Sequence, residues 1–146
     1  MDWLRELRGA VVGLDTAPLI YFLQDDASYG PVVQPFFEAM DRGDFSAVTS
    51  TLTLCEVLAQ PFRQGAAALV EEYRSILLNA AHLTTVDVTP EIAEAAARLR
   101  AEHGLRTPDA VQIATAVHQG ASFLLTNDLK LRAIPVLKVV VLADLR

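Results

Sequence analysis

Four acidic side chains, far apart in the sequence, are the residues best suited to carry chemistry. Asp15 and Asp128 each follow a short apolar run, whereas Glu56 and Asp109 lie in stretches with the apolar spacing of helices. An ionised carboxylate in such a stretch is costly unless it is paired, solvated or bound to metal. Hard cations such as Mg²⁺ or Mn²⁺ prefer oxygen ligands and would offset repulsion among clustered carboxylates. The four acids therefore predict a metal site, and metal-assisted hydrolysis of a phosphodiester is the chemistry it would support.

Polar and basic side chains accompany these acids. The residues expected to orient water, a phosphate or the carboxylates through hydrogen bonds are Thr16, Ser50, Thr126 and Asn127. The residues expected to contact nucleic-acid phosphates are Arg106, Lys130 and Arg132. Each of these has an ordinary alternative as a helix cap, a turn residue or a solvated surface group.

The acids also have ordinary alternatives when they are taken singly. Asp15 is suited to cap a helix, Asp109 to occupy a first helical turn, and Asp128 to close a turn through its side chain. A single acid at such a position is easily explained by capping or a turn. Four acids at matching positions are much harder to explain in this way, which favours a shared site. The three histidines do not show a close metal-ligand spacing, and we expect them on the surface or at helix ends.

Alternating strands and helices must position the acids. Strands are expected at residues 11–14, 45–50, 83–88, 123–126 and 139–142. Helices are expected at residues 16–23, 31–42, 66–81, 91–103 and 107–118, with a further one capped by Thr51 or Thr53 and limited or kinked by Pro61. Such alternation predicts a parallel sheet with helices on both faces. Ligands gather at the carboxyl ends of strands in these sheets, which places Asp15 and Asp128 at one edge.

Composition limits the class of protein. The 146 residues fit one domain, and we expect residues 11–146 to form it, with residues 1–10 as an extension. The net charge of −6 disfavours a broad basic surface for nucleic acid, so any such binding must be local. No apolar run approaches the roughly 20 residues of a membrane span, and the N-terminus lacks a secretory signal, so a cytoplasmic protein is expected. Cys55 is the only cysteine, and we expect a buried thiol.

Four segments of the chain resemble, in order and spacing, the motifs of the PIN-domain family. They read Val-Val-Gly-Leu-Asp-Thr at residues 11–16, Thr-Leu-Thr-Leu-Cys-Glu-Val-Leu at 51–58, Arg-Thr-Pro-Asp-Ala at 106–110 and Leu-Thr-Asn-Asp at 125–128. The similarity covers roughly residues 11–142, and within the family it is greatest to the VapC-type ribonuclease toxins of bacterial toxin–antitoxin modules.

The resemblance implies a fold and an activity. The fold would be a PIN-like three-layer α/β arrangement whose five-stranded parallel sheet has the order 3-2-1-4-5. Asp15, Glu56, Asp109 and Asp128 would form the metal-binding and catalytic quartet, with Mg²⁺ or Mn²⁺ balancing charge while water attacks an RNA phosphodiester. The resemblance also implies a homodimer and a cognate antitoxin that occupies the active-site groove.

The sequence leaves open which surface would form that homodimer. The helices between residues 31 and 81 are a plausible dimer surface because they carry apolar residues, namely Phe36, Phe37, Leu69 and Val70.

Two other functions remain open. Asp15 after a first strand would suit the nucleophile of a phosphotransfer or phosphatase domain, but residues 15–19 read Asp-Thr-Ala-Pro-Leu and lack the second acid of the dehalogenase-like pattern. A PIN-fold module that binds RNA or protein without hydrolysis is the other alternative, and the intact acidic quartet argues against it. Loss of hydrolysis on Asp15→Asn would favour the enzyme.

Overall fold

Strands and helices alternate along residues 3–146, the part of the chain that the computed structural model describes. The strands are β1 (Val11–Leu14), β2 (Ser46–Ser50), β3 (Leu83–Val86), β4 (Phe123–Thr126) and β5 (Lys138–Val141). The helices are α1 (Trp3–Glu6), α2 (Thr16–Leu23), α3 (Gly30–Arg42), α4 (Thr51–Arg63), α5 (Ala67–Asn79), α6 (Pro90–His103) and α7 (Thr107–His118), with 3₁₀ helices η1 (Leu129–Ala133) and η2 (Leu142–Leu145). No helix among these residues is long and apolar enough to cross a membrane.

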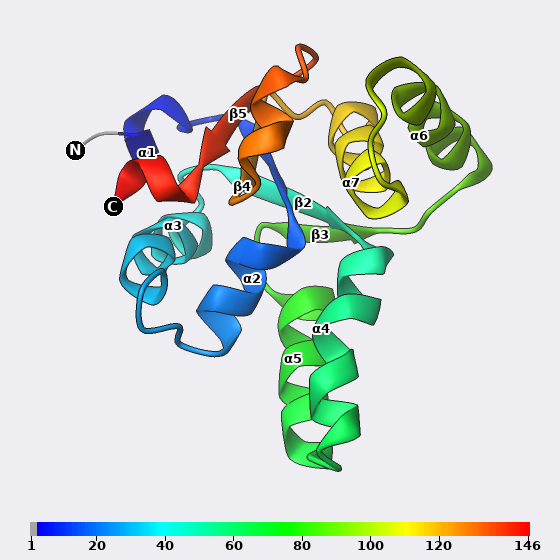
Figure 1. The fold of residues 1–146 in the computed structure, drawn as a ribbon. Coiled ribbons are helices and arrows are strands. Elements are labelled where there is room, and N and C mark those ends of the chain that lie inside the picture. The colour runs from blue at the N-terminus through cyan, green and yellow to red at the C-terminus, as the bar shows by residue number, and fades with distance from the viewer. Residues whose placement is uncertain (1–2) are drawn as a thin grey trace.

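The five strands form one parallel sheet in the order β3-β2-β1-β4-β5, which confirms the predicted fold class and strand order. β1 lies at the centre, where Val12 pairs with Ala47 of β2 on one side and with Phe123 of β4 on the other. α2 and α3 lie on one side of the sheet, and α6 and α7 lie on the other (Figure 1). Helices α4 and α5 project from the sheet as an antiparallel pair (Figure 1).

An aromatic core lies between the sheet and α3. Phe36 and Phe37 are 0% and 5% exposed, and their rings contact each other and that of Phe45 or Phe22. Full burial of such a side chain contributes about 1.5–3 kcal/mol to folding. The suggestion that Phe36 and Phe37 supply a dimer surface is therefore wrong, because both rings are buried in the core of their own chain.

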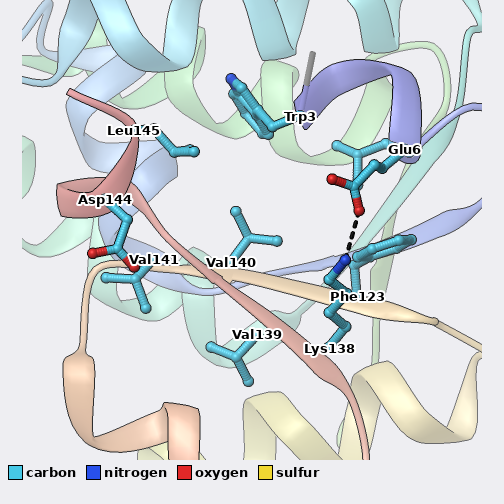
Figure 2. A pocket seen from close by; sticks show the side chains of 10 residues that line it. Trp3, Glu6, Phe123, Lys138, Val139, Val140, Val141, Asp144 and Leu145 are labelled. Atoms are coloured by element: carbon cyan, nitrogen blue, oxygen red, sulfur yellow. Dashed lines mark hydrogen bonds and ion pairs between the residues drawn. The ribbon is translucent and has the colours of Figure 1, made fainter. Parts of the chain in front are cut away.

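The N-terminal segment packs onto this core. Leu7 is fully buried, and the indole of Trp3 in α1 stacks on Phe36 with 6.0 Å between ring centroids. Glu6 forms an ion pair with Lys138 of β5, with 2.6 Å between Oε2 and Nζ. Figure 2 shows the cavity of about 210 Å³ that α1, β4, β5 and η2 enclose at this edge of the sheet, which we call the edge cavity.

A glycine on β1 lets α7 approach the sheet closely. A Cβ atom placed on Gly13 would lie 2.6 Å from Cβ of Ala116 in α7 and 3.2 Å from Cδ1 of Leu124. Real side chains do not approach this closely, so any larger residue at position 13 would push α7 outward. Gly13 therefore sets the distance between the central strand and the helix that carries Asp109.

Several local expectations need correction. Ser50, and not Thr51 or Thr53, caps α4, since its Oγ accepts a hydrogen bond of 3.0 Å from the backbone N–H of Leu52. Pro61 does not end α4, which continues to Arg63, because a proline in the last turn disrupts few helical hydrogen bonds. Cys55 is exposed and not buried, since α4 turns Val57 and Leu58 toward α5 instead.

Candidate active site

All four predicted acids line one cavity of about 690 Å³ beyond the carboxyl ends of β1 and β4, which we call the acidic cavity. They come from the end of β1, the second turn of α4, the first turn of α7 and the residue that caps η1. The residues that line the cavity are Asp15, Thr16, Ala17, Ile20, Tyr21, Glu56, Arg106, Pro108, Asp109, Asn127, Asp128, Leu129 and Lys130. Residues from distant parts of the sequence thus converge at the sheet edge where ligands usually bind.

Asp15 is held by two hydrogen bonds at the floor of the acidic cavity. Its Oδ1 accepts from the backbone N–H of Thr16 at 2.9 Å, and its Oδ2 accepts from the hydroxyl of Thr126 at 2.7 Å. Burial raises the pKa of Asp15 above its usual value, these hydrogen bonds oppose the rise, and the negative charges of Asp109 and Glu56 add to it. A positive charge in the cavity would favour the ionised form of Asp15.

Asp109 is the most buried of the four acids, at 8% exposed. It lies in the first turn of α7, where the unpaired backbone N–H groups of a helix favour negative charge. Arg106 is largely exposed and places its Nε 3.4 Å from Oδ2 of Asp109. The site therefore contains a basic side chain that is already in contact with one candidate ligand.

Glu56 and Asp128 lie at the more open side of the acidic cavity. Glu56 is exposed, and its Oε1 accepts a hydrogen bond of 2.6 Å from the hydroxyl of Thr16. Asp128 accepts from the backbone N–H of Lys130 at 3.0 Å and thereby caps η1. Asp15 likewise caps α2. Asp15 and Asp128 thus cap helices and also line the acidic cavity, so a capping role does not exclude a role in the site.

The remaining predicted residues separate into two groups. Thr126 contacts Asp15, and Asn127 lines the cavity while it bonds to the hydroxyl of Tyr21 at 3.3 Å and accepts from the backbone N–H of Ala143. Arg106 and Lys130 line the cavity as expected. Three residues do not line it: Thr126 is buried and reaches the site only through Asp15, Ser50 is buried as the cap of α4, and Arg132 pairs with Asp144.

Sequence reasoning missed a buried group of polar residues beneath the cavity. Gln112, Thr53 and Thr49 are 3%, 0% and 1% exposed and hydrogen-bond to one another, to Thr16 and to the backbone of Leu14. We call these three residues the polar layer. Their spacing held a signal, since Gln112 follows Asp109 by three residues and Thr53 precedes Glu56 by three, which places each pair on one face of a helix.

The donor set fits a hard divalent cation. The carboxylates supply only oxygen, and four of them face two basic side chains in a single cavity. Among residues 3–146, no three His, Cys, Asp or Glu side chains are already grouped closely enough to hold an ion. Carboxylate oxygens are ligands that Mg²⁺ prefers, and this ion usually keeps several waters and binds through one or two carboxylates together with substrate phosphates.

A family model described as PIN domain matches residues 12–137. Three solved structures share the fold: a VapBC complex of Rickettsia felis bound to a promoter DNA fragment, a toxin–antitoxin complex of Klebsiella pneumoniae, and a VapC toxin of Mycobacterium tuberculosis that cleaves the sarcin–ricin loop. Their identities are 18%, 24% and 14%, with TM-scores of 0.70, 0.70 and 0.64. The alignments cover 89%, 92% and 79% of this chain and 97%, 98% and 87% of theirs. No curated protein matches the sequence.

Proposed function

Because the chain belongs to the PIN domain family, we propose that it is a metal-dependent endoribonuclease and the toxin of a toxin–antitoxin pair. The observation that carries the proposal is the convergence of Asp15, Glu56, Asp109 and Asp128 on one cavity. Four carboxylates with only two basic neighbours form a poor binding surface for an anionic polymer unless a cation joins them. The same arrangement suits hydrolysis assisted by Mg²⁺ or Mn²⁺.

The four acids have different surroundings and therefore different proposed roles. Asp15 and Asp109, the more enclosed pair, are the ligands whose positions are best fixed, through Thr126 and through the first turn of α7. When bound, a divalent cation supplies Lewis-acid chemistry, which helps to activate water and stabilises charge on the phosphodiester oxygens. Glu56 is exposed and accepts a hydrogen bond from the hydroxyl of Thr16, which orients its carboxylate. It is the group placed to accept a proton from the attacking water.

RNA would reach the cavity along its basic rim. Arg106 and Lys130 both line the acidic cavity and are exposed, so their side chains are available to phosphates. The choice of RNA rests on the resemblance to VapC-type toxins and on the similarity to the Mycobacterium tuberculosis toxin, which cleaves the sarcin–ricin loop. With a net charge of −6, binding should depend on these local contacts and weaken as salt is added.

An antitoxin partner and a homodimer belong to the same proposal. The Rickettsia felis and Klebsiella pneumoniae structures are described as complexes of a toxin with an antitoxin, which supports a protein inhibitor for this chain. The homodimer rests on the family resemblance, and Leu69 and Val70 of α5 remain partly exposed as candidates for its surface. Light scattering at high protein concentration should give the mass of a dimer, and a monomer would contradict that part of the proposal.

The test is cleavage of a mixed pool of structured RNA by the purified chain with Mg²⁺, Mn²⁺ or EDTA. We expect cuts with either metal, none with EDTA, and none from Asp109→Asn, which keeps the size of the side chain and removes its charge. Asp41→Asn is the matched control, since Asp41 is exposed on α3 and does not line the acidic cavity. RNA binding that needs no metal and survives Asp109→Asn, without any cleavage, would instead support the non-catalytic module.

A further inference from the structure

The polar layer beneath the acidic cavity connects elements that the proposed mechanism uses separately. Gln112 of α7 contacts Thr53 of α4, and Thr53 contacts Thr49 of β2, with Nε2 to Oγ1 at 2.5 Å and Oγ1 to Oγ1 at 2.8 Å. The hydroxyl of Thr49 contacts the carbonyl oxygen of Leu14, the residue of β1 that precedes Asp15, at 2.9 Å. Nε2 of Gln112 also lies 3.3 Å from Oγ1 of Thr16, which contacts Glu56.

Proton counting gives the direction of the bonds on one side of the layer. A threonine hydroxyl has a single proton to donate, and a carbonyl oxygen can only accept. Thr49 therefore donates its proton to Leu14 and has none left for Thr53. The short contact between Thr53 and Thr49 must use the proton of Thr53, which leaves Thr53 able only to accept from any other neighbour.

The same reasoning applies on the other side. An ionised Glu56 can only accept, so the 2.6 Å contact uses the single proton of Thr16. The hydroxyl oxygens of Thr16 and Thr53 lie 3.3 Å apart, and neither has a proton left to share. They need a donor between them, and the amide nitrogen of Gln112 carries two N–H groups that reach both.

The opposite orientation of this amide is incompatible with the rest of the layer. The side-chain oxygen of Gln112 at the same place would need protons from Thr53 and Thr16, whose protons are already used. Thr49 or Glu56 would then lose its hydrogen bond. An unmade hydrogen bond in a buried layer is destabilising, so the orientation with Nε2 toward the threonines is favoured.

We propose that Gln112 is a positioning residue, whose amide donates to both Thr16 and Thr53 and thereby holds the Thr16 hydroxyl in place for its hydrogen bond to Glu56. This role rests on the proposed nuclease function. Without the amide, the hydroxyl oxygens of Thr16 and Thr53 face each other at 3.3 Å with no donor between them, so we expect Thr16 to move away from Thr53 and its hydrogen bond to Glu56 to be displaced. Loss of such a supporting group typically costs 10- to 100-fold in activity or metal affinity.

Substitution of the amide tests the role in catalysis. Gln112→Met keeps the length of the buried side chain and removes both N–H groups, and we expect kcat to fall at least about tenfold with little change in KM for RNA. Thr16→Val should lower kcat by a similar factor, and Thr16→Ser, which keeps the hydroxyl, should retain most of the wild-type kcat. The double variant Gln112→Met with Thr16→Val should be no slower than Thr16→Val alone, because both act through one hydrogen bond.

The matched control is Gln119→Met, at the exposed C-terminal end of the same helix, which should leave kcat unchanged. An active wild-type protein with unaltered kcat in Gln112→Met would overturn the role of Gln112 and leave the nuclease intact. If Gln112→Met fails to fold, full kcat in Thr16→Val overturns the proposal equally well. A wild-type protein that cleaves no RNA with either metal would instead overturn the proposed function.

Nuclear magnetic resonance of the metal-free protein tests the layer without any reference to activity. The side-chain amide protons of Gln112 should exchange slowly with water, and Thr16→Val and Thr53→Val should each shift one proton of the pair more than the other. The side-chain amide of Gln119 should not respond. Gln112 amide signals that exchange as fast as those of Gln119, or that ignore both valine variants, would contradict the proposed direction of the bonds.

Discussion

The acidic cavity and the edge cavity both present charged side chains at the sheet, but they balance those charges differently. At the edge cavity, Glu6 pairs with Lys138 (Figure 2). Asp144, which also lines this cavity, pairs with Arg132. In the acidic cavity four carboxylates share two basic side chains. Among the described residues, Asp109 is the one acid there with an ion-pair partner, at 3.4 Å.

The difference distinguishes charges that are paired with each other from clustered charges for which we propose a bound cation. Exposed ion pairs such as those at the edge cavity contribute about 0–1 kcal/mol to stability and are complete as they stand. Clustered carboxylates repel one another, so a cavity that gathers four of them is a candidate functional site.

The largest expected effect is on RNA cleavage. Asp15→Asn should lower kcat/KM by at least about 100-fold, because it removes a candidate ligand charge at the floor of the acidic cavity. Asp144→Asn, which removes one charge from the edge cavity, should leave cleavage unchanged. Single-turnover assays on one cleavable RNA would measure both, and equal losses in the two variants would remove the distinction between the cavities.

The next effect is stabilisation by metal. At a Mg²⁺ concentration 100 times its Kd, binding to the folded state alone adds about 2.7 kcal/mol to the free energy of unfolding. Urea unfolding with and without Mg²⁺ should show this gain in the wild type and in Asp144→Asn, and should show much less of it in Asp15→Asn. A gain of the same size in Asp15→Asn would place the ion elsewhere in the chain.

A smaller effect concerns pH in the absence of metal. The pKa of Asp15 is raised by burial, so between the usual carboxyl range and this raised value the folded chain binds more protons than the unfolded chain. The contribution of Asp15 to stability therefore increases as pH falls through its folded pKa and is lost as pH rises. Unfolding free energies of the wild type minus those of Asp15→Asn, from about pH 4 to 7, should show this slope. The opposite slope would contradict the cause assigned to the shift.

The smallest effect is expected at the edge cavity. The side chains of Glu6 and Lys138 are 56% and 63% exposed, so a double-mutant cycle with Glu6→Gln and Lys138→Met should give a coupling of about 0.2–1 kcal/mol in unfolding. The coupling should shrink in high salt. A coupling of several kcal/mol would mean that this pair is far less hydrated than its exposure indicates.

Local patterns in the sequence predicted the framework well. β1 and β4 occur where an apolar run ends at Asp15 or just before Asp128, and that same pattern located two of the four acids. These features depend on neighbouring residues alone. The apolar surroundings of Glu56 and Asp109 added the other two acids to the predicted metal site. The strand order and the catalytic role of the quartet came from the motif resemblance, which summarises long-range contacts that local rules do not contain.

What the sequence did not reveal depends on contacts between distant elements. Cys55 looked buried because its neighbours are apolar, yet which stripe of α4 faces α5 is decided by how the two helices pair. Arg132 was expected near phosphates, but η1 turns it toward Asp144. Gln112 went unnoticed because its partners lie 59 and 96 residues away.

The close approach at Gly13 has a consequence for how this chain tolerates variation. Asp15 lies two residues after Gly13 on one element, and Asp109 lies two turns before Ala116 on the other. The distance between Asp15 and Asp109 thus depends on the absence of a Cβ atom at Gly13 in the core. A natural variant or a designed sequence could therefore keep all four acids and still be inactive, because a larger residue at position 13 would change the distance between the acids.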